Sequence, residues 1–422
     1  MLKKITNYYF LIFNFITFFI LTAGNYIESD IKYHLLRIPY MLLLLLSVIA
    51  FYRFWKDRKN SDNIIKINLY IIIGLLLTYI FVFVVRLFRS GFGTAWLTFY
   101  PAIVVIFAGF IFLAFKTGIF KYEYLHRDII VIVFILTITQ LFFGFFTYGG
   151  IRASKLLENI MVFNSVVISY LPLQLYWIFT NRMEKHCFKN FVVSMCNIIL
   201  SIVMVIASGS RSAILILFVL VFLMSVINLT SRRNVMLIIG IITLSVTALF
   251  AMNASNSFGI KSSIERTSSS IFKPGELKEE ASEVSININE SNQIRSMLRD
   301  KSIAEIKKSP IIGTGNAFFK YKIGKMELEQ SSHNIILEIW LIFGMIGLII
   351  YLLLFSVIAK EGIILFIKRK DKRLYFTCML SILSTIGLAM FQPLMIMIIP
   401  NITFWTMISN LYNKGLIGEK YE

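Results

Sequence analysis

The long polar segment of this chain ends in SSHNIILEIW (residues 331–340), where serine and histidine give way to an apolar helix. The segment begins near Met252, and it is the one long water-compatible part of a sequence that is otherwise strongly apolar. It follows soon after SGSRSA (residues 208–213). We therefore predict a large hydrophilic loop between two membrane-spanning helices, lying over a site at the membrane surface.

The composition predicts a polytopic membrane protein. Hydrophobic residues make up 57% of the 422 positions and charged residues only 15%, which is more apolar surface than a soluble domain can bury. The net charge of +19 is explained by the Lys and Arg of cytoplasmic loops rather than by a nucleic-acid partner. The cysteines lie outside the polar segment and the four histidines are widely scattered, so we expect neither a disulfide in the loop nor a metal site.

A helix needs about 20 apolar residues to cross a bilayer, and this criterion predicts an all-α integral membrane protein with about twelve transmembrane helices. The predicted spans cover residues 8–23, 35–54, 67–85, 95–115, 128–148, 160–180, 190–207, 212–228, 235–252, 333–359, 374–391 and 394–411. We interpret the first as an uncleaved span, although its basic start is also typical of a signal peptide.

Lysine and arginine fix the orientation of these spans, because cytoplasmic loops are enriched in both. The clusters lie in alternate loops, at residues 53–59, 116–127, 182–189, 232–233 and 368–373. Both termini are then cytoplasmic, and the large loop between helices nine and ten is extracytoplasmic. The predicted organisation is helices one to nine in residues 1–252, the loop in residues 253–332, and helices ten to twelve with a cytoplasmic tail in residues 333–422.

Within the polar loop, residues 291–308 carry apolar side chains at roughly helical spacing, which predicts an amphipathic helix that lies on the membrane surface or caps the bundle. These side chains are Ile294, Met297, Leu298, Ile303 and Ile306. Pro310 should end that helix. Gly313-Thr314-Gly315 partly matches a phosphate-binding loop, but no Lys-Ser/Thr pair follows it, so we interpret it as a tight turn.

Several arginines lie at helix ends that face outward, where the orientation rule disfavours them. They are Arg37, Arg86, Arg89, Arg152 and Arg211. A cation close to the bilayer needs an anionic partner, whether a lipid head group, a nearby acid or a substrate. Arg211 differs because it opens a helix after a very short connection, where backbone N–H groups and a guanidinium together form a phosphate site.

His333 stands at the outer boundary of the apolar helix that begins near Asn334. Its imidazole, with an unperturbed pKa of about 6.5, can take a proton from a hydroxyl group. The alternative role is helix capping, beside Ser331 and Ser332. Glu338 lies inside the same helix, where a carboxylate needs a partner, so it either orients the catalytic group or pairs with an arginine.

Three segments, in this order, resemble the O-antigen ligase/polymerase superfamily of bacterial membrane glycosyltransferases. The first is SGSRSA (208–213), and the second is Arg295 followed by SP and GTG within residues 309–315. The third is SHNIILEIW (332–340), which runs into FGMIGL (343–348). The resemblance covers about residues 195–360, and the N-terminal half agrees with the family only in having many spans.

The resemblance implies an inverting, metal-independent glycosyl transfer that needs no cofactor and uses an undecaprenyl-pyrophosphate-linked glycan as donor. It implies that Arg211 and Arg295 hold the pyrophosphate, with Arg266 as a weaker candidate, and that His333 activates the acceptor hydroxyl. The remaining substrate-binding candidates are Arg86, Arg89, Arg152, Asn334 and Glu338. It also implies a bacterial inner-membrane protein whose active site faces the periplasm.

The same scaffold serves an O-antigen polymerase, which joins lipid-linked repeat units, and an O-antigen ligase, which moves the glycan onto lipid A-core of lipopolysaccharide. The Phe-rich and Lys-rich N-terminal half favours the polymerase. The partners expected are the lipid-linked glycan, an acceptor glycan or lipid A-core, membrane lipids and a chain-length regulator protein. A flippase or another transporter is the competing class, but the sequence shows no internal repeat. An assembly protein would leave the arginines and His333 without a role.

Overall fold

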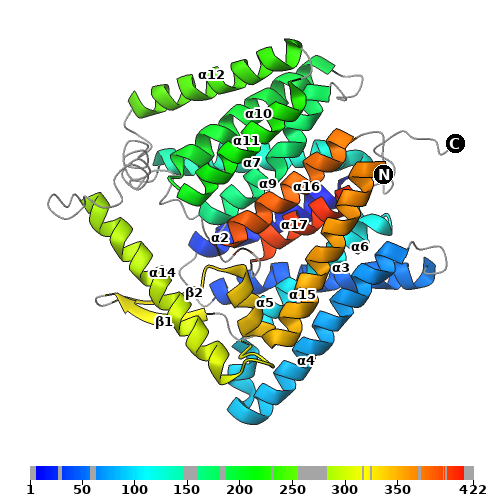
Figure 1. The fold of residues 1–422 in the computed structure, drawn as a ribbon, viewed down its shortest axis with the longest axis vertical. Coiled ribbons are helices and arrows are strands. Elements are labelled where there is room, and N and C mark those ends of the chain that lie inside the picture. Colours follow the sequence, from blue (N-terminus) through cyan, green and yellow to red (C-terminus); the bar gives the residue numbers. More distant parts are fainter. Residues whose placement is uncertain are drawn as a thin grey trace.

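The structure, a computed structural model, is almost entirely helical in the part of the chain that it describes (Figure 1). It describes residues 6–26, 31–57, 63–97, 99–146, 160–180, 187–229, 232–254, 283–315, 318–323, 326–368, 372–392, 394 and 397–412. The long helices are α2 (Tyr9–Tyr26), α3 (Ile31–Asp57), α4 (Asn63–Leu97), α7 (Leu125–Phe146), α9 (Ile160–Thr180), α10 (Cys187–Ala207), α11 (Arg211–Asn228), α12 (Arg232–Ala254), α14 (Glu283–Lys308), α15 (Ile335–Lys368), α16 (Lys372–Ala389) and α17 (Ile398–Leu411). The short elements are η1 (Thr6–Tyr8), α5 (Phe99–Phe107), α6 (Phe110–Lys116), η3 (Tyr122–Tyr124), β1 (Phe318–Ile323) and β2 (Met326–Ser331).

Helices occupy the predicted spans, in agreement with a helical membrane protein. Among the described residues, six helices are long and apolar enough to cross a membrane: Arg37–Lys56, Lys66–Phe88, Tyr122–Phe142, Ile160–Thr180, Arg211–Asn228 and Ile335–Ile367. Three further apolar helices are shorter, at Tyr9–Leu21, Ala102–Lys116 and Phe191–Ala207. The total of twelve spans and the side of the membrane on which the loop lies stay predictions.

The third and fourth predicted spans have different boundaries in the structure. α4 continues for 35 residues to Leu97, through the predicted loop that holds Arg86 and Arg89. At about 1.5 Å per residue this helix is roughly 50 Å long, so it exceeds the hydrocarbon core of a bilayer. The fourth span is divided into α5 and α6, which a turn at Ala108 and Gly109 separates.

α9 is the central helix of the bundle, and nearly all of its residues are buried between neighbouring helices. Its polar side chains bind those of other helices rather than lipid. Asn164 Nδ2 donates to Ser208 Oγ of α10 (3.0 Å), Asn197 Nδ2 of α10 donates to Gln174 Oε1 (2.9 Å), and Ser169 and Thr385 hydroxyls lie 2.6 Å apart. Such hydrogen bonds fix helix pairs in a membrane, where apolar burial between helices contributes little.

The polar loop contains the predicted helix and an additional β-hairpin. α14 extends from Glu283 to Lys308, and it runs along one side of the bundle in Figure 1. β1 and β2 pair antiparallel, with Phe318 opposite Ser331 and Ile323 opposite Met326. The hairpin was not expected from the sequence, although FFKYKI and MELEQS both alternate between apolar and polar residues around Gly324. It matters for the site because β2 leads directly into His333.

The chain that follows α14 is docked into a break in α15. Gly344, at φ 70°, interrupts α15, so the usual helical bond from the Met345 N–H to the Leu341 carbonyl is not formed. Met345 N instead donates to Pro310 O (3.0 Å), and the N–H groups of Thr314 and Gly315 donate to Leu341 O (2.7 and 2.9 Å). The turn predicted for Gly313-Thr314-Gly315 is therefore confirmed, and it anchors the loop to the bundle.

Candidate active site

A tight turn between α10 and α11 presents Arg211. Gly209 adopts φ 63°, a left-handed conformation that favours glycine, and this reverses the chain between the two helices. The Ser208 hydroxyl holds the turn, since it accepts hydrogen bonds from Asn164 Nδ2 (3.0 Å) and from Ser210 N (3.3 Å). Ser208 is almost completely buried, so the turn is fixed from beneath by α9.

The first turn of α11 is suited to bind an anion. Ser210 is the N-cap residue, but its side chain makes no capping hydrogen bond. The first backbone N–H groups of a helix lack partners inside the helix, and without a side-chain cap they remain available to a ligand. Together with the half-buried Arg211 guanidinium and the positive end of the helix dipole, they form the arrangement that the sequence predicted for phosphate.

Arg295 lies on the face of α14 that packs against the protein. The buried residues of that face are Leu298, Ser302 and Ile306, at four-residue spacing, and Arg295 precedes Leu298 by one turn. Leu298 and Ile306 confirm the predicted amphipathic pattern. Ile303 is 39% exposed, and the neighbouring Ser302 takes the buried position.

His333 occupies the junction between β2 and α15, with its imidazole half-buried. Its φ of 56° is the only positive φ of a non-glycine residue in the described part of the chain. Nδ1 is buried without a hydrogen-bond partner among the described residues, and Nε2 lies 3.5 Å from Gln330 Oε1. That second contact is too long to be a strong hydrogen bond, so Nε2 remains able to bond a substrate hydroxyl.

The three predicted catalytic side chains come together, although they belong to three separate segments. Burial lowers the pKa of Arg295, and the charge of Arg211 lowers it further. Burial also lowers the pKa of His333 to about 4, with an additional contribution from the charge of Arg295. Each residue therefore lies within electrostatic range of the next. The result is a neutral imidazole near the Arg295 guanidinium, which in turn lies near that of Arg211.

This cluster has an excess of positive charge. The described part of the chain places no carboxylate within ion-pair distance of Arg295, and its ion pairs are Arg127–Asp128, Arg299–Asp300 and Lys308–Glu305. Two nearby guanidinium groups repel each other and remain charged at all physiological pH values. A bound anion removes that repulsion, so the site favours an anionic ligand.

Asn334 and Glu338 have structural partners beside His333. Asn334 Oδ1 accepts hydrogen bonds from the N–H groups of Ile336 (3.0 Å) and Leu337 (3.2 Å), so Asn334, and not His333, caps α15. Glu338 is completely buried, and its Oε1 accepts a hydrogen bond from Ser331 Oγ (2.7 Å). The partner of this carboxylate is thus a serine, and no arginine pairs with it among the described residues.

Of the other arginine candidates for substrate binding, the structure describes the side chain of Arg86 alone. Arg86 is half-buried on α4, and Glu305 of α14 lies within its electrostatic range. Arg89 belongs to the same helix, but its side chain is outside the described part. Arg152 and Arg266 both lie outside the described residues. Their predicted roles in substrate binding stay predictions.

An apolar groove of about 430 Å³ runs along α11 between α10 and α12. On α11 its wall includes Ile214, Phe218, Val221 and Ser225. Three- and four-residue spacings on a helix mark one face, and the same series begins at Arg211. Arg211 therefore lies at the N-terminal end of the helix face that lines the groove.

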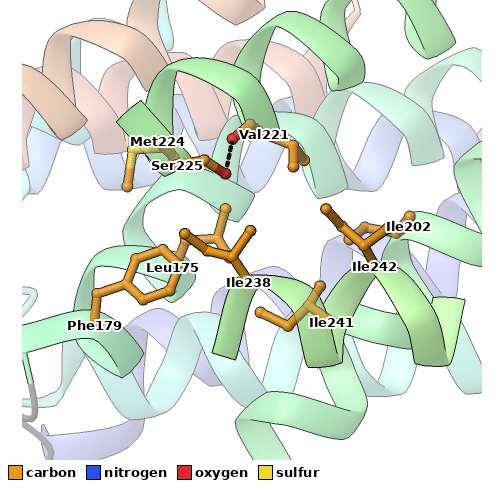
Figure 2. Close-up of a pocket in the computed structure, with 9 residues that line it drawn as sticks. All are labelled: Leu175, Phe179, Ile202, Val221, Met224, Ser225, Ile238, Ile241 and Ile242. Carbon is orange, nitrogen blue, oxygen red and sulfur yellow. Dashed lines mark hydrogen bonds between the residues drawn. The ribbon is translucent and has the colours of Figure 1, made fainter. Parts of the chain in front are cut away.

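The groove deepens toward α9. Val221 and Ser225 also line a small pocket that Leu175 and Phe179 close from α9. Figure 2 shows this pocket, in which the only hydrogen bond drawn joins Ser225 Oγ to the Val221 carbonyl (2.6 Å). That hydroxyl bonds to its own helix, so it does not make the pocket polar.

Residues 196–352 match the family model described as O-antigen ligase. The matched range contains Arg211, Arg295 and His333. No curated protein matches the chain. This match supports membership of the O-antigen ligase/polymerase superfamily, whose members are glycosyltransferase-like membrane enzymes of polysaccharide biosynthesis. The family implies a lipid-linked glycan and an acceptor as substrates, while the chain-length regulator stays a prediction.

Sequence reasoning missed the hydrogen bonds that Ser331 and Gln330 make with His333, and the break at Gly344. Ser331 was considered only beside a capping residue, and no motif pointed to Gln330. The break had a sequence signal in Gly344 itself. A glycine within a long apolar helix indicates a kink or a close backbone approach.

Proposed function

We propose that this protein transfers a glycan from an undecaprenyl-pyrophosphate carrier to an acceptor hydroxyl, with inversion and without a metal, at the outer face of the membrane. The observation that carries the proposal is the cluster of Arg211, Arg295 and a neutral His333. Two cations suit the binding of a pyrophosphate. A neutral imidazole can accept the proton that the attacking hydroxyl must lose.

Arg211 and Arg295 stabilise the leaving group. When the anomeric C–O bond breaks, its electron pair goes to the pyrophosphate oxygen, and negative charge grows there. Guanidinium groups already held in place stabilise that charge in the transition state. The N-terminus of α11 adds backbone N–H groups for a second phosphate oxygen.

His333 removes the proton from the acceptor. The acceptor oxygen attacks the anomeric carbon from the face opposite the pyrophosphate, and its proton passes to an imidazole nitrogen, which inverts the configuration. In the unliganded site the pKa of His333 is low. A bound pyrophosphate offsets the charge of Arg295, so donor binding raises the pKa of His333 and makes the imidazole a stronger base.

The groove along α11 supports a lipid-borne donor. It is apolar, it faces outward from the bundle, and its helix begins at Arg211. An isoprenoid chain in this groove would place its pyrophosphate at the helix N-terminus. A nucleotide sugar, in contrast, has no apolar chain to fill the groove.

Polymerase is the specific activity that we propose, with lipid A-core ligase as the alternative. Both reactions use the same donor chemistry, so the acceptor distinguishes them. A transporter is less consistent with the structure. Broken helices do occur, but residues of the polar loop fill the break at Gly344, which leaves no ion or substrate site there.

Polysaccharide banding in a strain that lacks this chain tests the proposal. A polymerase predicts core with a single repeat unit, whereas a ligase predicts core alone with polymer retained on the lipid carrier. Complementation by R211A, R295A or H333A proteins at normal membrane levels should fail. The matched control is R299A, because Arg299 lies on the same helix as Arg295 but is exposed and paired with Asp300. Long-chain product from the three site variants would refute the enzyme.

A further inference from the structure

Ser331 links a buried carboxylate to the backbone of His333. The Ser331 hydroxyl donates to Glu338 Oε1 at 2.7 Å and accepts a hydrogen bond from the His333 N–H at 3.4 Å. Ser331 is 1% exposed and Glu338 is 0% exposed. These residues close a ring of contacts from the end of β2, through His333, to the first turn of α15.

His333 needs such support because its backbone conformation is unfavourable. At φ 56° it lies in the left-handed region, which a residue with a Cβ rarely adopts. Strained residues persist only where the surrounding structure holds them, and they cluster at functional sites. Asn334 contributes by capping α15, since its Oδ1 accepts hydrogen bonds from the N–H groups of Ile336 and Leu337.

The hydrogen-bond polarity fixes the roles of the two supporting groups. The His333 N–H can only donate, so the Ser331 oxygen accepts from it and the Ser331 proton must go elsewhere. The Ser331 hydroxyl donates its proton to Glu338 Oε1, and this hydrogen bond sets the rotamer of the serine. Because Glu338 is needed here as a hydrogen-bond acceptor and not as a charge, an uncharged side-chain oxygen at the same place would serve equally well.

We infer that Ser331 and Glu338 are positioning residues that hold the His333 imidazole in place for proton transfer. The inference rests on the proposed role of His333 as the base. Neither residue needs to touch the substrate. Their effect should therefore be on kcat, with the KM for the donor unchanged, because binding of the donor depends on Arg211 and Arg295.

The test uses purified full-length protein in nanodiscs and a polyprenyl-pyrophosphate-linked glycan as both donor and acceptor. We expect S331A and E338L to lower kcat at least tenfold while the KM changes less than twofold. E338Q, which keeps the acceptor oxygen, should retain kcat within about threefold of the wild type. S332A is the matched control, because the Ser332 hydroxyl bonds to Asn334 O and not to Glu338.

A double-mutant cycle separates positioning from a general loss of structure. A His333→Gly protein has no imidazole to position, so we expect adding Ser331→Ala to change its residual kcat less than twofold. An equal tenfold loss in that background would overturn the inference, as would an E338Q protein as impaired as E338L.

The two proposals fail in different ways. If H333A transfers glycan at the wild-type rate, the proposed function of His333 is wrong. If H333A is impaired but S331A and E338L are as active as the wild type, only the positioning role is wrong. Folding of each variant is checked by its elution as a single species and by its melting temperature in detergent.

Discussion

The backbone of Gly313, in the turn after α14, lies directly against the backbone of Gly344, in the break of α15. A Cβ atom on Gly313 would fall 2.4 Å from Gly344 N, and one on Gly344 would fall 2.1 Å from Ile311 O. Both glycines also have positive φ, at 79° and 70°. This contact fixes where the polar loop meets the bundle, and therefore where Arg295 stands relative to His333.

Alanine at Gly313 or Gly344 should destabilise the protein. A left-handed residue with a Cβ costs about 1–2 kcal/mol, and displacement of the touching backbone adds to that, so we expect a loss of at least about 2 kcal/mol. Thermal unfolding in detergent measures the change. Gly240 of α12 is the control, since a Cβ there meets nothing within 4 Å, and G240A should unfold at the wild-type temperature or above it.

The pH dependence of transfer should report the low pKa of His333. Burial and Arg295 lower this pKa to about 4, so the base is neutral at pH 5 and above and becomes protonated as the pH falls through 4. The acid limb of kcat/KM, which reports the free enzyme, should then lie near pH 4. The acid limb of kcat, which reports the enzyme with donor bound, should lie at higher pH, because bound pyrophosphate raises the pKa of His333.

Arg295→Gln provides the control for this profile. It removes one cause of the low pKa, so the kcat/KM limb of the residual activity should move upward but stay below about 6.5, since burial remains. A wild-type limb at the ordinary histidine value, unchanged in Arg295→Gln, would contradict the electrostatic coupling of the two residues.

Substitution of Arg211 should separate charge from geometry. R211K keeps a point charge but loses the planar fork, and we expect kcat to fall about tenfold. R211A loses both, and a loss on the order of 10²–10³ in kcat is expected, as for other groups that stabilise a developing anion. Equal activity of R211K and the wild type in a nanodisc transfer assay would mean that the guanidinium binds no substrate oxygen.

Filling the groove should select against long lipid chains. Val221→Trp places a large ring in the groove, so the KM for a donor with a long polyprenyl chain should rise while that for a short-chain analogue changes little. Leu215→Trp is the matched control, because Leu215 is 62% exposed on α11 and does not line the groove. If both tryptophans have the same effect on both donors, the groove holds ordinary membrane lipid instead.

Much of this architecture can be predicted from the sequence, because membrane helices and surface helices have direct physical signatures. Long apolar runs mark the spans, and in the predicted orientation the positive-inside rule disfavours the position of Arg211. Leu298 and Ile306 place α14 correctly, and Arg295 shares their face by spacing alone. The family resemblance added His333, which spacing could not distinguish from a capping residue.

The parts that could not be predicted depend on contacts between distant segments. The hairpin is short, and strand propensity depends strongly on packing context, so neither six-residue strand stands out in the sequence. Gly344 signals the break in α15, but the groups that bond there, the Pro310 carbonyl and the Thr314 N–H, come from the polar loop and could not be assigned from the sequence. Likewise, Ser331 gains its role from Glu338, seven residues away, across the turn into α15.

The most direct test of the central claim measures donor binding and single-turnover transfer separately in nanodiscs. We predict that H333A binds the polyprenyl-pyrophosphate-linked glycan with the wild-type Kd but transfers it about 10²–10⁴ times more slowly, whereas R211A and R295A weaken binding and transfer together. A folded H333A protein that transfers bound donor at the wild-type rate would contradict the claim that Arg211, Arg295 and His333 form one catalytic site.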